Sequence, residues 1–137
     1  MKKVIFLCTG NSCRSIMAEF ILSHFGKNKY YAYSAGSKPI GTVNPNALYI
    51  LSINNIPTNN HSSKSWDSFK GNQFDYIVTV CNNAANETCP IYPGNSTKLH
   101  WDIPDPATVI GNHEIIKKEF QKVYELIKKN ITKEFLK

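Results

Sequence analysis

Long apolar runs are missing from this sequence of 137 residues. No stretch approaches the ~18 apolar residues that a membrane-spanning helix needs. The first apolar run, VIFLC at residues 4–8, follows two lysines but is shorter than the ~7–15 residues of a signal-peptide core. We therefore expect a cytoplasmic protein that does not associate with a membrane.

Acidic residues are also in the minority, with 10 Asp and Glu against 16 Lys and Arg, so the net charge is +6. The sequence nevertheless lacks the aromatic-interleaved basic patch or the known motif of a nucleic-acid-binding protein. We expect no nucleic-acid partner and interpret the charge as a mild attraction for anionic substrates. Much of the excess lies near the C-terminus, where it predicts a solvated helix face, in Lys117, Lys118, Lys122, Lys128, Lys129, Lys133 and Lys137.

Internal repeats, linkers and low-complexity segments are absent, so residues 1–137 are predicted to form one domain. Hydrophobic residues make up 42% and charged residues 19%, which is typical of a folded globular chain. A chain of this length buries roughly 65–70% of its unfolded surface, which is enough for a single core.

What the sequence does contain is an alternation of strands and helices. Two continuous apolar segments predict strands of the kind found in parallel sheets covered on both faces. We therefore predict an α/β fold, a three-layer domain with a four-stranded parallel sheet and a flavodoxin-like arrangement. The expected strands are residues 3–8, 30–34, 75–81 and 99–101, and the expected helices are residues 13–25, 44–54 and 112–135.

The segment CTGNSCRS, residues 8–15, joins the first predicted strand to the first predicted helix. The amides of such a turn can form an inward-facing nest, and together with the positive helix end they bind a tetrahedral oxyanion. Glycine permits a positive φ and asparagine tolerates one, while an arginine fork suits two oxygens of the anion. The predicted oxyanion-binding residues are Thr9, Gly10, Asn11, Ser12, Cys13 and Arg14.

Cys8 ends the first strand and lies in the positive field of this loop, which favours the thiolate. Ser15 can donate a hydrogen bond to that thiolate. In this interpretation Cys8 is a nucleophile and Arg14 holds what it attacks. Two alternatives stay open at this point: a buried cysteine that only ends a core strand, and a non-catalytic oxyanion-binding module with an unreactive Cys8.

Six motifs follow one another along the chain: CTGNSCRSIMAE at 8–19, YSAG at 33–36, VNP at 43–45, VTVC at 78–81, CP at 89–90 and HWDIPDPA at 100–107. This order resembles the low-molecular-weight protein tyrosine phosphatase fold family, and more narrowly the arsenate reductases of that family. The resemblance implies the fold of that family. It also implies that Asp105, stiffened by Pro104 and Pro106, protonates a leaving oxygen.

The resemblance also implies a thiol relay. Cys8 takes the arsenate, Cys81 attacks Cys8 and releases arsenite, and Cys89 attacks Cys81, leaving a disulfide that thioredoxin reduces. Cys8 and Cys81 both end predicted parallel strands, so they are expected on one edge of the sheet. Exchange requires each thiol to reach the next, so residues 82–88 must rearrange. We therefore predict a monomeric arsenate reductase of arsenic detoxification that uses no cofactor.

The alternative is a phosphotyrosine phosphatase that uses a phosphocysteine on Cys8 and needs no further thiols. Phosphatases of this fold usually carry tyrosines directly after the Asp-Pro pair, whereas Ala107 and Thr108 stand there. Tyr92 and Trp101 could wall a phosphotyrosine groove, or they could be packing residues. The phosphatase branch also suggests a protective disulfide between Cys8 and Cys13, which is compatible with either activity.

The sequence predicts neither a zinc site nor a potassium site. Zinc would require ligands whose spacing matches no usual finger or ribbon, namely Cys81, Cys89, His100 and His113. Some members of the resembling family bind potassium with an Asn, a Ser, a Thr and an Asp. Asn11, Ser34 and Ser62 match the first three, but Lys64 stands in place of the Asp. Its ammonium group could replace the potassium ion, so we predict no metal.

Overall fold

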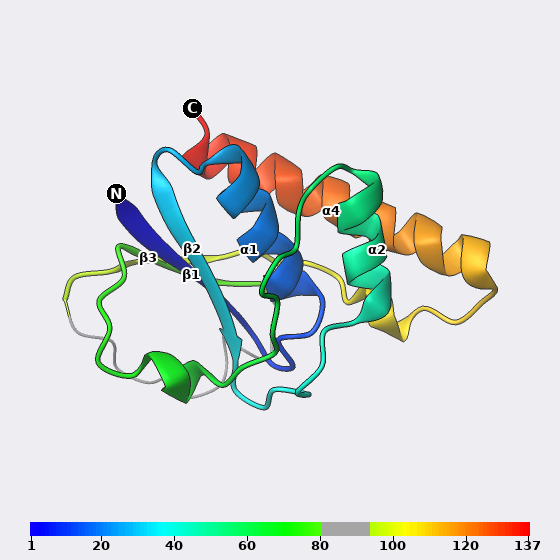
Figure 1. Cartoon of the computed structure of the whole chain (residues 1–137), viewed down its shortest axis with the longest axis horizontal. Helices are drawn as coiled ribbons and strands as arrows, with labels where there is room; N and C mark the ends of the chain where they lie inside the picture. Colours follow the sequence, from blue (N-terminus) through cyan, green and yellow to red (C-terminus); the bar gives the residue numbers. More distant parts are fainter. Residues whose placement is uncertain (81–93) are drawn as a thin grey trace.

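The computed structural model describes residues 1–80 and 94–137. Its sheet has four strands, all parallel, in the order β2-β1-β3-β4 (Figure 1). This confirms the predicted α/β fold with a four-stranded parallel sheet. In the described part of the chain, no helix combines the length and the apolar character needed to cross a membrane. The strands are β1 (Lys2–Cys8), β2 (Tyr30–Gly36), β3 (Tyr76–Thr79) and β4 (Thr97–His100).

An asparagine side chain caps the start of α2 and of α4, whereas α1 follows Cys13 without a side-chain cap. The Asn44 side chain accepts a hydrogen bond from Asn46 N at 2.9 Å, and Pro45 holds the first helical position of α2. The Asn112 side chain accepts from Ile115 N at 3.0 Å at the start of α4. The helices are α1 (Arg14–Phe25), α2 (Pro45–Ile53) and α4 (His113–Phe135), with two short 3₁₀ turns that were not predicted, η1 (Trp66–Phe69) and η2 (Pro106–Thr108).

Alternate side chains of β1 enter two apolar clusters, one on each face of the sheet. Val4 and Phe6 point into the cluster formed with α1, α2 and α4. Ile5 and Leu7 point into the second cluster, which Trp66 and other aromatic side chains complete. All four side chains are fully buried, so burial on both faces explains why the first strand is a continuous apolar run.

The register of the sheet brings the carboxyl ends of its strands together at one edge. Cys8, the last residue of β1, pairs with Gly36, the last residue of β2. Thr79 at the end of β3 pairs with Leu7 and with His100 of β4. The observed β2 extends to Gly36, whereas the predicted strand ended at residue 34. The observed β4 spans Thr97–His100 in place of the predicted residues 99–101.

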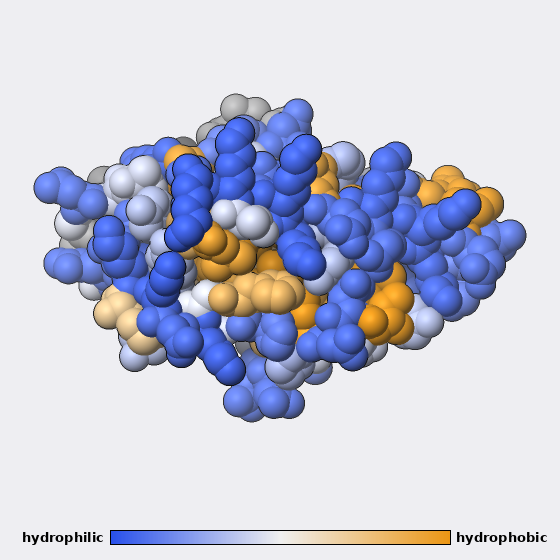
Figure 2. Space-filling view, turned by 90° about the horizontal axis from the view of Figure 1, so that it is seen from above, coloured by the Kyte–Doolittle hydropathy of each residue, from blue (hydrophilic) through white to orange (hydrophobic). Residues whose placement is uncertain are grey.

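The lysines of α4 partly explain the excess of positive charge. Figure 2 shows hydrophilic side chains over most of the face seen from above, with apolar patches between them. The Lys117 ammonium lies 4.9 Å from the centre of the Tyr49 ring, and the Lys128 ammonium lies 5.0 Å from that of Phe25. Lysines that cover partly exposed aromatic rings stabilise the helix surface, which is one role for this charge.

Candidate active site

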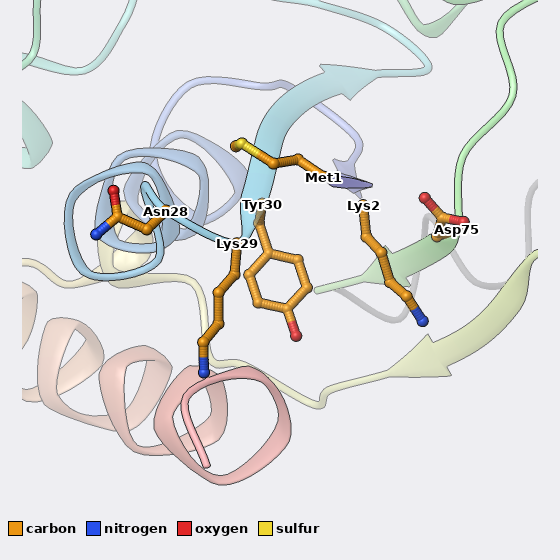
Figure 3. A pocket seen from close by; sticks show the side chains of 6 residues that line it. All are labelled: Met1, Lys2, Asn28, Lys29, Tyr30 and Asp75. Carbon is orange, nitrogen blue, oxygen red and sulfur yellow. The ribbon is translucent and has the colours of Figure 1, made fainter.

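A hollow of about 520 Å³ lies at the amino ends of β1 and β2, opposite the edge where Cys8 lies. Figure 3 shows the residues that line it: Met1, Lys2, Asn28, Lys29, Tyr30 and Asp75. None of them belongs to a motif identified in the sequence. The candidate site is instead the loop between β1 and α1, at the carboxyl edge.

The carbonyl groups of this loop point outward. Thr9 O accepts a hydrogen bond from Lys38 N at 2.9 Å, and Gly10 O accepts from Ile40 N at 3.0 Å and from the Ser63 hydroxyl at 3.2 Å. Ser12 O accepts from Asn44 N at 2.9 Å. The segment after β2 therefore runs along the outside of the loop and holds its carbonyl groups.

The amides of the loop face inward as a consequence. In a trans peptide the N–H points opposite to the carbonyl, so the N–H groups of Gly10, Asn11 and Cys13 point into the ring. Asn11 N lies 3.3 Å from Cys8 Sγ and donates to it. This is the nest that the sequence predicts, and it suits a tetrahedral oxyanion.

Of the two residues that the sequence offers for a positive φ, Asn11 takes that conformation, with φ 46°, and Gly10 does not. Gly10 is close to the Ile40 side chain, since a Cβ atom there would lie 3.1 Å from Ile40 Cδ1. Asparagine tolerates the left-handed region better than other non-glycine residues, and its side chain is anchored on three sides.

Those three anchors all involve the carboxamide of Asn11. Its Oδ1 accepts from Lys64 N at 2.8 Å. Its Nδ2 donates to Ser15 Oγ at 2.8 Å and to Ser34 Oγ at 3.0 Å. Because Ser15 Oγ accepts from Asn11, its own hydrogen is available for Cys8 Sγ, which lies 2.9 Å away. The geometry matches the predicted donation from Ser15 to a Cys8 thiolate.

Gly36 allows β2 to approach the loop closely. A Cβ atom there would lie 2.4 Å from Thr9 O, 3.0 Å from Asn11 N and 3.0 Å from Cys8 O. All three atoms are backbone, so no side-chain rotation could relieve the overlap. Glycine is therefore required at the end of β2 by the backbone of the loop beside it.

Arg14 opens α1 and reaches across to the loop that carries Asp105. Its Nη1 donates to Ile103 O at 3.1 Å, and its Nη2 lies 3.6 Å from Asp105 Oδ2. Its Nε is buried and has no hydrogen-bond partner among the described residues. Arg14 thus has a donor to offer to an anion in the loop while it is attached to the Asp105 loop.

Asp105 caps the short η2 turn, and its Oδ1 accepts from Ala107 N at 3.0 Å. The Cys13 thiol donates to the same oxygen at 3.7 Å. Burial raises the pKa of Cys13 to about 12, and the charges of Asp105 and Cys8 add to that rise. Cys13 is therefore a protonated thiol at neutral pH.

Lys64 lies beside the Asn11 network. Its ammonium group donates to Ser62 O at 2.9 Å and to Ser34 Oγ at 3.4 Å, and lies 3.6 Å from Glu19 Oε1. The Ser34 hydroxyl donates to the same Glu19 oxygen. Burial raises the pKa of Glu19, and Lys64 is the main influence that opposes this rise.

The structure brings together most of the site residues expected from the sequence. Glu19 was missed, although it lies four residues after Ser15 and therefore on the same side of α1. Cys81, Cys89 and Tyr92 lie outside the described residues. Trp101, considered for a substrate groove, packs against Phe6 with ring centres 5.8 Å apart.

Residues 3–137 match the family described as low molecular weight phosphotyrosine protein phosphatase. The chain belongs to that family. It is 40% identical over 134 residues to a protein named arsenate reductase from Bacillus subtilis, a match that covers 98% of this chain and 94% of the relative.

Solved structures of the family agree with the observed fold. An arsenate reductase in the phosphate binding state is 26% identical, has a TM-score of 0.72, and is matched over 97% of this chain and 98% of that one. A thioredoxin-dependent arsenate reductase from Corynebacterium glutamicum is 29% identical with a TM-score of 0.64. That match covers 94% of this chain and 61% of the other.

Proposed function

We propose that this protein reduces arsenate to arsenite, with Cys8 as the nucleophile. The observation that carries the proposal is the position of the Cys8 thiol. Its sulfur lies within a ring of inward amides, 2.9 Å from Ser15 Oγ and 3.3 Å from Asn11 N. A thiolate held in this way attacks an oxyanion bound in the same ring. The relative named arsenate reductase, 40% identical over nearly the full chain, supports arsenate as that oxyanion.

In the first step the Cys8 thiolate attacks arsenic, so that an S–As bond forms and an As–O bond breaks. Asp105 gives a proton to the departing oxygen, which leaves as water, and Asp105 becomes a carboxylate. Arsenic stays in the arsenic(V) state. The amide ring and Arg14 stabilise the negative charge of the transition state.

The reduction itself uses two further thiols, which we assign to Cys81 and Cys89. The Cys81 thiolate attacks Cys8 Sγ; the S–As bond breaks, its electron pair stays on arsenic, and arsenite leaves. The Cys89 thiolate then attacks Cys81, which frees Cys8 and leaves a Cys81–Cys89 disulfide. A thioredoxin dithiol reduces that disulfide, a choice supported by the thioredoxin-dependent structural relative. The scheme needs no metal or cofactor, and we expect a cytoplasmic monomer.

A second candidate is hydrolysis of a phosphate ester through a phosphocysteine. Cys8, Arg14 and Asp105 suffice for that reaction, and the family is named for it. Two features favour reduction. The Asp-Pro pair is followed by Ala107 rather than a tyrosine, and Trp101, a candidate wall for a phosphotyrosine groove, packs against Phe6 and the core.

The test compares arsenate-dependent NADPH consumption, with thioredoxin and thioredoxin reductase present, with hydrolysis of p-nitrophenyl phosphate. The wild-type protein should consume NADPH, and Cys8→Ser should lose both activities because a neutral hydroxyl is a poor nucleophile here. If Cys8→Ser kept about a tenth of the wild-type rate, another group would be the nucleophile. If the wild type hydrolysed the ester but consumed no NADPH with arsenate, the phosphatase candidate would replace the proposal.

A further inference from the structure

The carboxylate of Asp105 is held by donors from two directions. Ala107 N, within its own turn, donates to Oδ1 at 3.0 Å, and the Cys13 thiol donates to the same oxygen at 3.7 Å. The other oxygen, Oδ2, faces the Arg14 guanidinium at 3.6 Å. The two oxygens of Asp105 are therefore not equivalent.

This difference decides where a proton can be carried. Oδ1 already accepts from an N–H and an S–H, so a proton on that oxygen would oppose both donors. Oδ2 faces only the charged group of Arg14 among the contacts described for it. When the anion shares the positive charge of Arg14, Oδ2 is therefore the oxygen of Asp105 that can carry a proton.

Arg14 cannot hold Asp105 and clasp the substrate with the same donors. Its Nη2 faces Asp105 Oδ2, while its Nη1 is engaged with Ile103 O. A bidentate grip on an oxyanion needs two N–H groups of the fork; Nε has no partner among the described residues and can supply one, but the second must come from a terminal nitrogen, so the anion and Asp105 Oδ2 then share the charge of Arg14. Cys13, directly before α1, makes the other contact with the Asp105 carboxylate through its thiol. The anion does not compete for this contact.

We propose that Cys13 is a positioning residue for the acid: its thiol holds Asp105 Oδ1, so that Oδ2 carries the proton and delivers it to the leaving oxygen. The inference rests on the proposed role of Asp105 in the first chemical step. The Oδ2–H bond breaks, the leaving oxygen gains that proton, and Asp105 returns to the carboxylate. Cys13 exchanges no electrons and keeps its hydrogen throughout.

Two observations support a thiol that acts only as a donor. Cys13 is 7% exposed, and burial raises its pKa to about 12, so it keeps the hydrogen that the contact needs. It also lies directly before Arg14, so the residue that grips the anion and the residue that holds the acid are neighbours on one short piece of chain.

The test uses two aryl phosphates that differ in leaving group, under reducing conditions. p-Nitrophenolate leaves readily without a proton, whereas phenolate depends on the acid. The measured quantity is kcat/KM, which reports the steps up to formation of the phosphocysteine. Asp105→Asn sets the reference, with an expected loss of roughly 10²–10⁴-fold for phenyl phosphate and a smaller loss for p-nitrophenyl phosphate.

Cys13→Ala should show the same pattern with smaller losses. Its kcat/KM should fall roughly 10-fold more for phenyl phosphate than for p-nitrophenyl phosphate. Cys13→Ser should restore most of the loss with phenyl phosphate, because its hydroxyl can donate to Oδ1 in the same way. Ile21→Val, which removes one methyl group from the buried side of α1, controls for lost packing and should affect both substrates equally.

Equal losses for both substrates in Cys13→Ala, or no rescue by Cys13→Ser, would overturn the inference. If the wild type hydrolysed neither ester, the rate of the first arsenate turnover would replace kcat/KM, and a Cys13→Ala variant with the wild-type rate would overturn the inference. A wild type that hydrolysed both esters but did not reduce arsenate would remove the proposed function, and the comparison of the two esters would still decide the role of Cys13.

Discussion

The side-chain donors of Asn11, Ser34 and Ser15 form a directed chain of hydrogen bonds that ends at Cys8. The two amide hydrogens of Asn11 go to Ser15 and Ser34, and the Ser34 hydroxyl goes to Glu19. The hydrogen of Ser15 is therefore directed to Cys8 Sγ at 2.9 Å. Because charge-assisted hydrogen bonds are stronger than neutral ones, this chain stabilises the thiolate more than the thiol. The reactive form of Cys8 thus depends on side chains from α1, β2 and the segment before η1.

The thiol of Cys13 should make stability depend on pH in the alkaline range. Its pKa is raised from 9.0 to about 12 on folding. The contribution is fully present below about pH 9 and is lost as pH rises through about 12, because only the unfolded chain releases the proton in that window. Between about pH 8 and pH 10.5 the wild type should lose about 2 kcal/mol that Cys13→Ser does not lose.

Urea unfolding of both proteins across that pH range measures this difference. Since lysines and tyrosines titrate in both proteins alike, the comparison isolates Cys13. Parallel curves for the two proteins would show that the Cys13 thiol is not buried as described.

The loop between β1 and α1 is held in shape by the segments that pack outside it, above all by the end of β2. Gly36→Ala would place a Cβ atom 2.4 Å from Thr9 O and 3.0 Å from Asn11 N. Both are backbone atoms of the loop, so the loop must move. Binding of phosphate or arsenate, measured by calorimetry, should weaken at least ~10-fold, because the displaced amides no longer converge on the anion.

Gly10→Ala is the matched control for Gly36→Ala. A Cβ atom at Gly10 would meet only the end of the Ile40 side chain, at 3.1 Å. Ile40 is 68% exposed and can move aside, so binding should change by less than about threefold. If the two variants bound the anion equally well, close packing of β2 against the loop would not explain the shape of the site.

The helix starts were predictable because their causes are local. Asn44 and Asn112 cap the helices that directly follow them, and Pro45 fits the first position of a helix. The loop between β1 and α1 was predictable for the same reason, since Cys8 and Arg14 are separated by only a few residues.

Features that depend on distant segments could not be found in this way. The positive φ falls on Asn11 because Lys64 and Ser34, far along the chain, anchor its side chain. Glu19 is partly covered because Ser34 of β2 and Lys64 contact its carboxylate. Its spacing of four residues from Ser15 places it on the same side of α1, but these distant partners are known only from the fold.

Three separate parts of the chain meet at Lys64. Its ammonium group contacts Glu19 of α1, Ser34 of β2 and the carbonyl of Ser62. Because a fixed positive charge already neutralises Glu19, exchanging sodium for potassium should leave activity unchanged and move the melting temperature by less than about one degree. A thermal melt in each salt at equal ionic strength measures this.

Lys64→Met is the control, since it keeps most of the side-chain volume and removes the charge. It should lower stability by roughly 1–3 kcal/mol, because the Glu19 carboxylate then lacks its positive neighbour. A potassium-specific rise of several degrees in the wild type would show that the protein binds a cation at this place and that the Lys64 ammonium does not replace it.

The protein as a whole is proposed to move two electrons from thioredoxin to arsenate, and this separates it from a phosphatase. Ester hydrolysis needs the loop and Asp105 alone, whereas reduction needs all three thiols of the relay. Cys81→Ser and Cys89→Ser should therefore both keep hydrolysis of an aryl phosphate and both lose continuous arsenate reduction.

The most direct measurement is the amount of arsenite released per enzyme by the two variants, with mass spectrometry of the product after thiol blocking. Cys89→Ser should release about one arsenite and trap a Cys8–Cys81 disulfide, because no third thiol can free Cys8. Cys81→Ser should release none, since nothing attacks the adduct on Cys8. Continuous thioredoxin-coupled turnover by both variants would contradict the relay and make the phosphatase candidate the better account.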